Sequence, residues 1–466
     1  MISSLKCFFE PKSVAVIGAS EKPGTIGRAL MTNLLERFKG KIYPVNIKYD
    51  QVFGLKCYKS VKEIPDEVDL AVIAVPAPVV VNVARECGEK GIKGLLVISA
   101  GFKEIGEEGA KREEELVKVV EKYGMRLIGP NCLGIYDAHT GLDTIFNPSD
   151  RQAKPEPGPV AFISQSGALG AAVLDWIAIT GIGLSKFISY GNAADVDEST
   201  LIEYLAEDPK TSVITCYIEG VRDGRKFMNA IRKAIKNKKP VIVLKAGKTE
   251  HGVRAVSSHT GSIAGSYEVY EAALKQVGAI VVDELEDLIV AAKVLSWQPP
   301  ARGNRIAIVT NGGGAGVLAT DAIERSGMKM AKLGQHTIEK LRSVLPLAAS
   351  PYNPVDILGD APVERYENAI KITASDPNVD ALIVITIMQS PALNADQLRQ
   401  RLKAIREDID KPMVMVAPGG EYTEKHSSKI EKEAKIPVFK TPEQAVKAIR
   451  IAVEWGKILR KYGLIG

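Results

Sequence analysis

Two patterns of hydrophobic and polar positions, one typical of strands and one typical of helices, follow each other along the whole chain. Short runs rich in β-branched residues, such as SVAVIGAS at 13–20 and RIAIVTNG at 305–312, predict buried strands. Longer segments, in which apolar residues recur on one helical face, follow these runs. Strands that alternate with helices are typical of parallel sheets with crossover helices, so the pattern predicts an α/β fold.

Two proline-rich joints interrupt this pattern, at 151–160 (RQAKPEPGPV) and at 296–305 (SWQPPARGNR). With 466 residues the chain is too long for one ordinary core. We therefore expect three domains, each a Rossmann-like or flavodoxin-like doubly wound parallel sheet. Their expected ranges are 1–150, 151–298 and 299–466.

Two segments of the last domain give more specific expectations. The prolines of SPYNPVDILGDA, at 350–361, predict a loop rather than a regular element. The segment EQAVKAIRIAVEWGKILRKYG, at 443–463, has the pattern of a basic amphipathic helix. We expect its apolar stripe to face the core rather than a partner.

Each expected domain opens with a strand, a turn rich in glycine and serine, and an amphipathic helix. A helix N-terminus presents unpaired N–H groups, and glycine lets an anion approach that backbone closely. Any doubly wound domain needs a tight turn at this point, but three such turns in one chain favour anionic ligands. The turn residues are Gly18, Ala19, Ser20, Gly24, Thr25 and Gly27, then Ser164, Gln165, Ser166 and Gly167, then Gly313, Gly314, Ala315 and Gly316.

The second strand of the first domain, KIYPVN at 41–46, argues against NAD binding. A dinucleotide enzyme usually has an acidic residue at the end of this strand for the ribose hydroxyls. Asn46 and Lys48 stand there instead, and a lysine suits a phosphorylated ribose such as that of coenzyme A. Ligands of open α/β sheets lie over the carboxyl ends of the strands. The later strand tips expected in the same groove are Val75, Pro76, Ser99, Ala100, Gly101 and Asn131.

The second domain offers a candidate catalytic pair. The strand TSVITCYIEG places Glu219 at its carboxyl end, and the next strand leads to His259 in RAVSSHTGSIAG at 254–265, which we expect to be a loop. A carboxylate that binds one ring nitrogen fixes the tautomer and leaves the other nitrogen free to attack. The phosphate-type helix start at 164–167 belongs to the same expected sheet. We therefore expect His259 to accept a phosphoryl group, although a histidine satisfied within the fold is the alternative.

Composition narrows the class of protein. The formal net charge of +5 is spread without a basic block, so nothing indicates nucleic acid. No apolar run reaches the roughly 18–20 residues of a membrane span, and no signal peptide is present, which predicts a cytoplasmic protein. The five cysteines show no metal-ligand spacing, and no second ligand stands near His259, so we expect no metal site. Without a nearby histidine–carboxylate pair, Cys132 is expected to be a packed or groove-lining thiol.

Nine of these stretches together carry a family resemblance. They occur in the family's order over nearly the whole chain: VAVIGAS, KIYPVN, AVIAVPA, SAGFKE, GPNCLG, AFISQSGALG, SYGNAADVDE, SSHTGSIAG and TNGGGAGVLATD. The chain resembles the α subunits of archaeal-type ADP-forming acetyl-CoA synthetases. These belong to the acyl-CoA synthetase (NDP-forming) superfamily, which includes succinyl-CoA synthetase.

The resemblance implies a reaction, acyl-CoA + ADP + phosphate ⇌ acid + ATP + CoA. It implies that His259 is the phosphorylated histidine and that Glu219 in YIEG pairs with it. ISQSGALG and NGGGAG would hold the phosphate, and residues 18–27 with Asn46, Lys48, the 75–76 pair and Asn131 would bind coenzyme A. A histidine that serves two distant sites must move, so we expect the His259 loop to swing between subunits. The flanking Gly252, Gly261 and Gly265 would permit this motion.

One departure from the family concerns the nucleotide. Some members are single long chains with an ATP-grasp domain, for which this chain has no room, and no P-loop pattern is present. We therefore expect ADP and Mg²⁺ to bind mainly on a β subunit, in an α2β2 assembly. Three alternatives stay open. The first is the same reaction with a different acid, such as succinate, a branched acid or an aryl acid. The others are a CoA-sensing subunit without catalysis and an NAD-dependent dehydrogenase.

Overall fold

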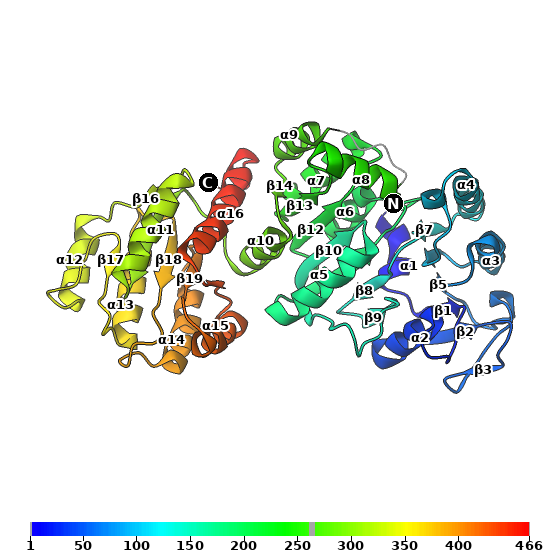
Figure 1. Cartoon of the computed structure of the whole chain (residues 1–466), viewed down its shortest axis with the longest axis horizontal. Helices are drawn as coiled ribbons and strands as arrows, with labels where there is room; N and C mark the ends of the chain where they lie inside the picture. The colour runs from blue at the N-terminus through cyan, green and yellow to red at the C-terminus, as the bar shows by residue number, and fades with distance from the viewer. Residues whose placement is uncertain (1, 261–265, 466) are drawn as a thin grey trace. The chain divides into compact units, whose positions relative to one another are not determined.

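The computed structural model describes residues 2–260 and 266–465, with side chains described for 4–256 and 266–465. It contains three large sheets and one two-stranded hairpin (Figure 1). The chain forms two compact units, Met1–Leu288 and Ile289–Gly466, of which the first holds two of the large sheets. The predicted α/β class is confirmed. The division at residues 150 and 298 stays a prediction.

The first sheet has five parallel strands in the order β2-β1-β5-β6-β7. Its strands are β1 (Ser13–Ile17), β2 (Lys41–Val45), β5 (Leu70–Ile73), β6 (Gly94–Val97) and β7 (Arg126–Ile128). The accompanying elements are η1 (Ile2–Leu5), α1 (Lys6–Phe9), α2 (Ile26–Arg37), η2 (Val61–Glu63), α3 (Ala77–Lys90), η3 (Lys103–Ile105) and α4 (Glu107–Lys122). The hairpin of β3 (Gln51–Val52) and β4 (Leu55–Lys56) follows β2.

The second sheet has seven strands in the order β14-β13-β12-β10-β11-β8-β9. Its strands are β8 (Ile135–Asp137), β9 (Leu142–Asp143), β10 (Pro157–Ser164), β11 (Leu184–Ser189), β12 (Val213–Ile218), β13 (Val241–Lys245) and β14 (Ile280–Val282). Two pairs in this sheet are antiparallel, β11 with β8 and β8 with β9. Strands β8 and β9 come before the expected boundary at residue 150. The helices are α5 (Gly167–Thr180), α6 (Glu198–Glu207), α7 (Gly224–Lys236), α8 (Glu250–Thr260), α9 (Tyr267–Val277) and α10 (Leu285–Trp297).

The third sheet is parallel, in the order β16-β15-β18-β19-β20 with β17 beside β15. Its strands are β15 (Arg305–Thr310), β16 (Lys329–Met330), β17 (Val355–Asp356), β18 (Ala381–Ile385), β19 (Met413–Val416) and β20 (Val438–Phe439). The helices are α11 (Gly313–Arg325), α12 (Gln335–Val344), α13 (Val363–Ala374), α14 (Ala395–Asp408), α15 (Glu421–Ala434) and α16 (Pro442–Lys461).

The expectation of a loop at 350–361 is wrong in one detail. Val355 and Asp356 form the short strand β17, which pairs in parallel with Val309 and Thr310 of β15. Both prolines of the segment, Pro351 and Pro354, precede this strand, so they do not remove the backbone N–H groups of the two paired residues. The expected final helix is confirmed as α16, and Ile449, Ala452 and Trp455 of its apolar stripe are buried.

Alternation along the strands of the third sheet supplies two cores, one on each face. On β18, Leu382 and Val384 pack in one cluster with α13 and α14. Ala381, Ile383 and Ile385 pack in the other with α11 and α16. A parallel strand that is covered on both faces reads as a continuous apolar run, which is why ALIVI predicts a strand and not a helix. Among the described residues, no helix is both long and apolar enough to cross a membrane.

Candidate active site

The helix start after β10 has the form expected of an anion site. Ser166 is the N-cap of α5, and its hydroxyl accepts a hydrogen bond from the backbone N–H of Leu169 at 3.4 Å. Gly167 is the first helical residue, so it adds no side chain over the exposed N–H groups. Ser164 is fully buried, and its hydroxyl donates to the Ser166 carbonyl at 2.7 Å. Ser164 therefore shapes the turn rather than facing a ligand.

Gln165 and Glu219 join this helix start to the end of β12. The side-chain oxygen of Gln165 accepts hydrogen bonds from the backbone N–H groups of Glu219, at 2.8 Å, and Gly220, at 3.1 Å. The ammonium group of the buried Lys245 donates a hydrogen bond to the Glu219 carbonyl at 2.9 Å. The backbone of Glu219 is thus held from two sides. The two predicted segments lie on adjacent strands of the same sheet.

The Glu219 carboxylate also acts on its neighbours. Burial raises the pKa of Tyr217 to about 12, and the charge of Glu219 and a side-chain hydrogen bond to it add to the shift. Burial lowers the pKa of Lys245, while Glu219 opposes that shift. Glu219 itself is buried, with 5% of its surface exposed. A carboxylate in such surroundings is suited to hold a cationic or hydrogen-bonding partner such as an imidazole.

A cavity of about 650 Å³ lies at this point of the first unit. It is lined by tips of both sheets, and helix α5 begins in its wall. Seven residues that the sequence singles out line it together: Ser99, Ala100, Asn131, Gln165, Ser166, Gly167 and Glu219. Three of the expected CoA-binding residues therefore share one cavity with the expected phosphate-binding turn and Glu219.

Charge is sparse in this cavity. Among its described lining residues, Lys103 is the single cation and Glu219 the single carboxylate. Its other polar side chains include asparagine and glutamine amides and the hydroxyls of Ser99 and Ser166. Cys132 lines the wall but is buried, and its thiol donates to the Val97 carbonyl at 3.3 Å. Burial raises the pKa of Cys132 to about 12, so the expectation of a packed, groove-lining thiol is confirmed.

Sequence reasoning missed several lining residues, among them Lys103, Phe146, Asn147 and Asn192. Lys103 and Asn192 lie within SAGFKE and SYGNAADVDE, two of the stretches that carry the family resemblance. The signal was therefore present, but the pattern of the sequence gave no chemical reason to select these two positions.

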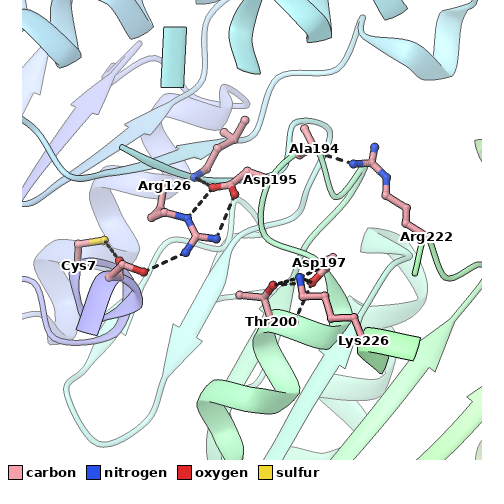
Figure 2. A network of polar contacts seen from close by, with 10 residues as sticks. Cys7, Arg126, Ala194, Asp195, Asp197, Thr200, Arg222 and Lys226 are labelled. Carbon is pink, nitrogen blue, oxygen red and sulfur yellow. Dashed lines mark hydrogen bonds and ion pairs between the residues drawn. The ribbon is translucent and has the colours of Figure 1, made fainter. Parts of the chain in front are cut away.

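The segment that carries Asn192 is clamped by ion pairs (Figure 2). Arg126 forms a two-pronged pair with Asp195, at 2.9 and 3.0 Å, and the Lys226 ammonium pairs with Asp197 at 2.9 Å. The Asp195 carboxylate also accepts from the backbone N–H of Leu127 at 2.8 Å. Paired, hydrogen-bonded charges of this kind fix a loop more firmly than isolated surface pairs do.

The first helix start is built by close backbone approach. Gly27 packs so tightly on Gly18 that a Cβ atom at Gly27 would lie 2.0 Å from the Gly18 carbonyl oxygen. Thr25 is the N-cap of α2, and the Asn46 amide donates to the Ala19 carbonyl at 2.8 Å. These contacts explain the small residues of the turn. The expected residues of the first domain that do not line the cavity are Gly18, Ala19, Ser20, Gly24, Thr25, Gly27, Asn46, Lys48, Val75, Pro76 and Gly101.

The expectation that His259 lies in a loop is wrong for its backbone. His259 stands in the last turn of α8, and Arg254 is also helical. Helix α8 contacts η3, the turn that carries Lys103, so the helix of the histidine runs next to an element of the cavity wall. The side chain of His259 lies outside the described residues, and so do Gly261 and Gly265. Its pairing with Glu219 stays a prediction.

The third helix start belongs to the second unit. Gly312 is the N-cap of α11, and its N–H donates to the Thr310 hydroxyl at 2.9 Å. The Asn311 amide oxygen accepts from the Ile387 N–H at 2.7 Å, which ties the turn to the end of β18. The expected phosphate-binding residues form the first turn of this helix, and they are Gly313, Gly314, Ala315 and Gly316. Their role stays a prediction.

Three family models match the chain in succession. Residues 12–138 match a CoA binding domain, residues 157–295 a succinyl-CoA ligase-like flavodoxin domain and residues 306–461 a ligase-CoA domain. The chain is 46% identical to the α subunit of acetate–CoA ligase (ADP-forming) II of Pyrococcus furiosus, over 97% of this chain and 98% of that one. It is 47% identical to acetate–CoA ligase (ADP-forming) I of Archaeoglobus fulgidus, over 97% of this chain but 64% of that longer one.

A solved structure agrees with these matches. The dinucleotide-forming acetyl-coenzyme A synthetase 1 of Ca. Korarchaeum cryptofilum, in complex with phosphate and ADP, superposes with a TM-score of 0.92 at 38% identity. The match covers 100% of both chains. Together with the fold, these matches place the chain in the acid–CoA ligase class. The chain belongs to the family of α subunits of ADP-forming acetate–CoA ligases.

Proposed function

We propose that this chain is the α subunit of an enzyme that converts acetyl-CoA, ADP and phosphate into acetate, ATP and CoA. The observation that carries this proposal is the cavity at which three of the expected CoA-binding residues, the start of α5 and Glu219 meet. An enzyme that moves phosphorus at a thioester needs these three features within reach of one another. A dehydrogenase has no use for the last two of these features, the start of α5 and Glu219 in one cavity.

The first step is an attack on the thioester. An oxygen of inorganic phosphate attacks the acetyl carbonyl carbon, the C–S bond breaks, and CoA leaves as a thiolate that takes up a proton. The product is acetyl phosphate. Unpaired N–H groups at the start of α5 are suited to hold the phosphate, and the sparse charge of the cavity strengthens such hydrogen bonds.

The second step transfers the phosphoryl group to His259. One ring nitrogen attacks the phosphorus atom, the bond from phosphorus to the acetate oxygen breaks, and acetate leaves. In this proposal Glu219 accepts the hydrogen bond of the other ring nitrogen, which selects the reactive tautomer and stabilises the positive ring. The backbone contacts of Glu219 with Gln165 and Lys245 would hold the carboxylate in place for this role.

The third step needs a partner chain. A terminal phosphate oxygen of ADP attacks the phosphohistidine, and the N–P bond breaks to give ATP. The relative of Pyrococcus furiosus, which is named an α subunit, matches the chain over 98% of its own length, so we assign ADP to a β subunit with an ATP-grasp module in an α2β2 assembly. Mg²⁺ would neutralise the nucleotide phosphates there. Among the described residues, no group of three His, Cys, Asp or Glu side chains is placed to hold a metal ion.

Phosphoryl transfer between distant sites requires that His259 move, because the reacting atoms must approach within about 3–3.5 Å. We therefore propose that the segment around His259 swings between the cavity and the nucleotide site. All five cysteines are unpaired thiols, which supports a reducing compartment such as the cytoplasm.

Reconstitution tests this function. The chain is mixed with its β subunit, acetyl-CoA, ADP, phosphate and Mg²⁺, and ATP is measured against time. We expect ATP only when both chains are present and only when CoA is released in equal amount. ATP synthesis by the chain alone would contradict the division of labour, and a preference for another acyl-CoA would replace acetate with that acid.

A further inference from the structure

Two carboxylates hold the side chain of Asn192 at the edge of the cavity. Its amide nitrogen donates to Glu104 at 2.7 Å and to Glu113 at 2.8 Å. Asn192 is 7% exposed, and it lines the cavity. Both N–H groups of the Asn192 amide therefore donate to carboxylates, which carry negative charge.

This arrangement leaves Asn192 one orientation. A carboxylate accepts hydrogen bonds and repels a carbonyl oxygen, so the amide cannot turn its oxygen toward Glu104 and Glu113. The oxygen must face the opposite side, where the Asn131 amide nitrogen donates to it at 3.3 Å.

The orientation of the Asn192 amide also fixes the orientation of the Asn131 amide. Its nitrogen is turned toward Asn192, so its side-chain oxygen faces another way, and the residue lines the cavity. Its backbone is fixed as well, with a φ of 60° and an N–H that donates to the Ser99 carbonyl at 3.0 Å. Asn131 is thereby prepared to accept a hydrogen bond from a ligand.

Glu104 does two tasks with its two oxygens. One oxygen accepts from the backbone N–H groups of Gly101, at 2.6 Å, and Phe102, at 3.1 Å, which closes the turn after β6. The other binds Asn192. Burial alone would raise the pKa of Glu104, but the hydrogen bonds from Asn192 and the turn outweigh it and lower the pKa. The residue therefore stays ionised, as its role at Asn192 requires.

We propose that Glu104 is a positioning residue that acts through Asn192 on Asn131, whose side-chain oxygen accepts an amide N–H of the thioester-bearing arm of coenzyme A. This ligand assignment rests on the proposed function. The chemistry selects the arm over the other reactants, because an acceptor oxygen needs a donor. The arm has amide N–H groups, whereas acetate has no donor. The phosphate dianion has one O–H group, but its charged oxygens would be repelled by the oxygen of Asn131.

The path from Glu104 through Asn192 to Asn131 is called the relay below. The variant Glu104→Gln tests it, since glutamine keeps the shape of the side chain. Its oxygen can still close the turn at Gly101 and Phe102, but its NH2 group then faces the NH2 group of Asn192. The binding of CoA to the full chain is measured by calorimetry, with thermal unfolding recorded alongside. We expect about a tenfold weaker affinity for CoA with an unchanged thermal midpoint. The exposed Glu115→Gln on α4, the next helix along the chain, is the matched control and is expected to bind as wild type.

A double variant separates positioning from a structural effect. Asn131→Gly removes the acceptor and tolerates the positive φ, and we expect it to weaken CoA binding at least as much. Adding Glu104→Gln to it should then have no further effect, because the relay has lost its end point. If Glu104→Gln also lowers the thermal midpoint, Asn131→Asp tests the position of Asn131 instead. This variant places an oxygen against the Asn192 oxygen, and we expect it to weaken CoA binding as well.

Two results would overturn the relay while leaving the proposed function intact. These are wild-type affinity in Glu104→Gln, and losses that add up in the double variant. A wild-type chain that does not bind CoA would instead overturn the proposed function and, with it, the ligand named here.

Discussion

The side-chain oxygen of Gln165 accepts hydrogen bonds from the backbone N–H groups of both Glu219 and Gly220. One glutamine thus couples the start of α5, where phosphate is expected, to the end of β12, where the candidate partner of the histidine stands. A catalytic carboxylate must be held in place before the reaction, and this contact fixes the residue that carries it.

Removal of this coupling should impair catalysis. Gln165→Ala leaves two backbone N–H groups without their acceptor, at a cost of about 1–3 kcal/mol if they stay buried. We expect the rate of phosphohistidine formation to fall at least about tenfold. Rapid-quench labelling measures it, and the exposed Gln51→Ala serves as control. An unchanged rate in Gln165→Ala would mean that the position of Glu219 does not depend on this contact.

Neutralisation of Glu219 tests the proposed pair. Glu219→Gln keeps the shape of the side chain but cannot stabilise a positively charged ring, and we expect phosphorylation to slow by about 10² to 10³. Single-turnover labelling with acetyl phosphate isolates this step. Glu156→Gln, an exposed position in the same unit, should react as wild type, whereas a full rate in Glu219→Gln would remove the glutamate from the mechanism.

The pH response of Cys132 follows from its burial. Because the pKa of this thiol is raised from 9.0 to about 12, the thiol stays protonated in the folded chain across about pH 7 to 9. Alkylation of Cys132 should be undetectable in the native chain and rapid after unfolding. The stability that the neutral thiol contributes is complete below pH 9.0 and is lost as the pH rises toward about 12.

A nucleophilic Cys132 would behave in the opposite way. It would react at neutral pH in the folded chain, and Cys132→Ser would abolish activity. We expect Cys132→Ser to keep activity within about twofold of wild type, since a hydroxyl can donate to the Val97 carbonyl as the thiol does.

Gly191 sets the course of the segment before Asn192. Its φ is 54°, and a Cβ atom there would lie 2.3 Å from the Pro130 carbonyl oxygen. Gly191→Ala should therefore lower the free energy of unfolding by about 2–4 kcal/mol, the sum of backbone strain and a forced displacement. Gly54→Ala is the matched control, because its φ of 74° is similar and no heavy atom lies within 4 Å. Denaturant unfolding should show a loss of about 1–2 kcal/mol there. Equal losses in both variants would show that the contact with Pro130 has no weight.

The sequence predicted the strands and helix starts well, for a local reason. Runs such as RIAIVT are buried on both faces, and the glycines after them mark turns that other residues do not fit. These signals lie within ten residues of one another. Helix α8 was missed because EHGVRAVSSHT contains a glycine and two serines, which are poor helix formers.

The network at the cavity edge could not be predicted from local pattern. Glu104 and Asn192 are 88 positions apart, and Asn131 and Asn192 are 61 apart. Their meeting depends on how two sheets pack in one unit. Conversely, Ser164 was selected for its place in a serine-rich turn, but its hydroxyl donates to the backbone carbonyl of Ser166. The side chains of small polar residues at turns commonly hydrogen-bond to the nearby backbone, so their presence alone does not indicate a ligand.

The central claim is that His259 carries the phosphoryl group. The most direct test is to incubate the chain with acetyl phosphate, digest it under neutral conditions, and map the added mass by peptide sequencing. We predict one phosphate on the peptide that contains His259, labile in acid, stable in base and absent from His259→Ala. A phosphate on another residue, or unchanged labelling of His259→Ala, would contradict the account.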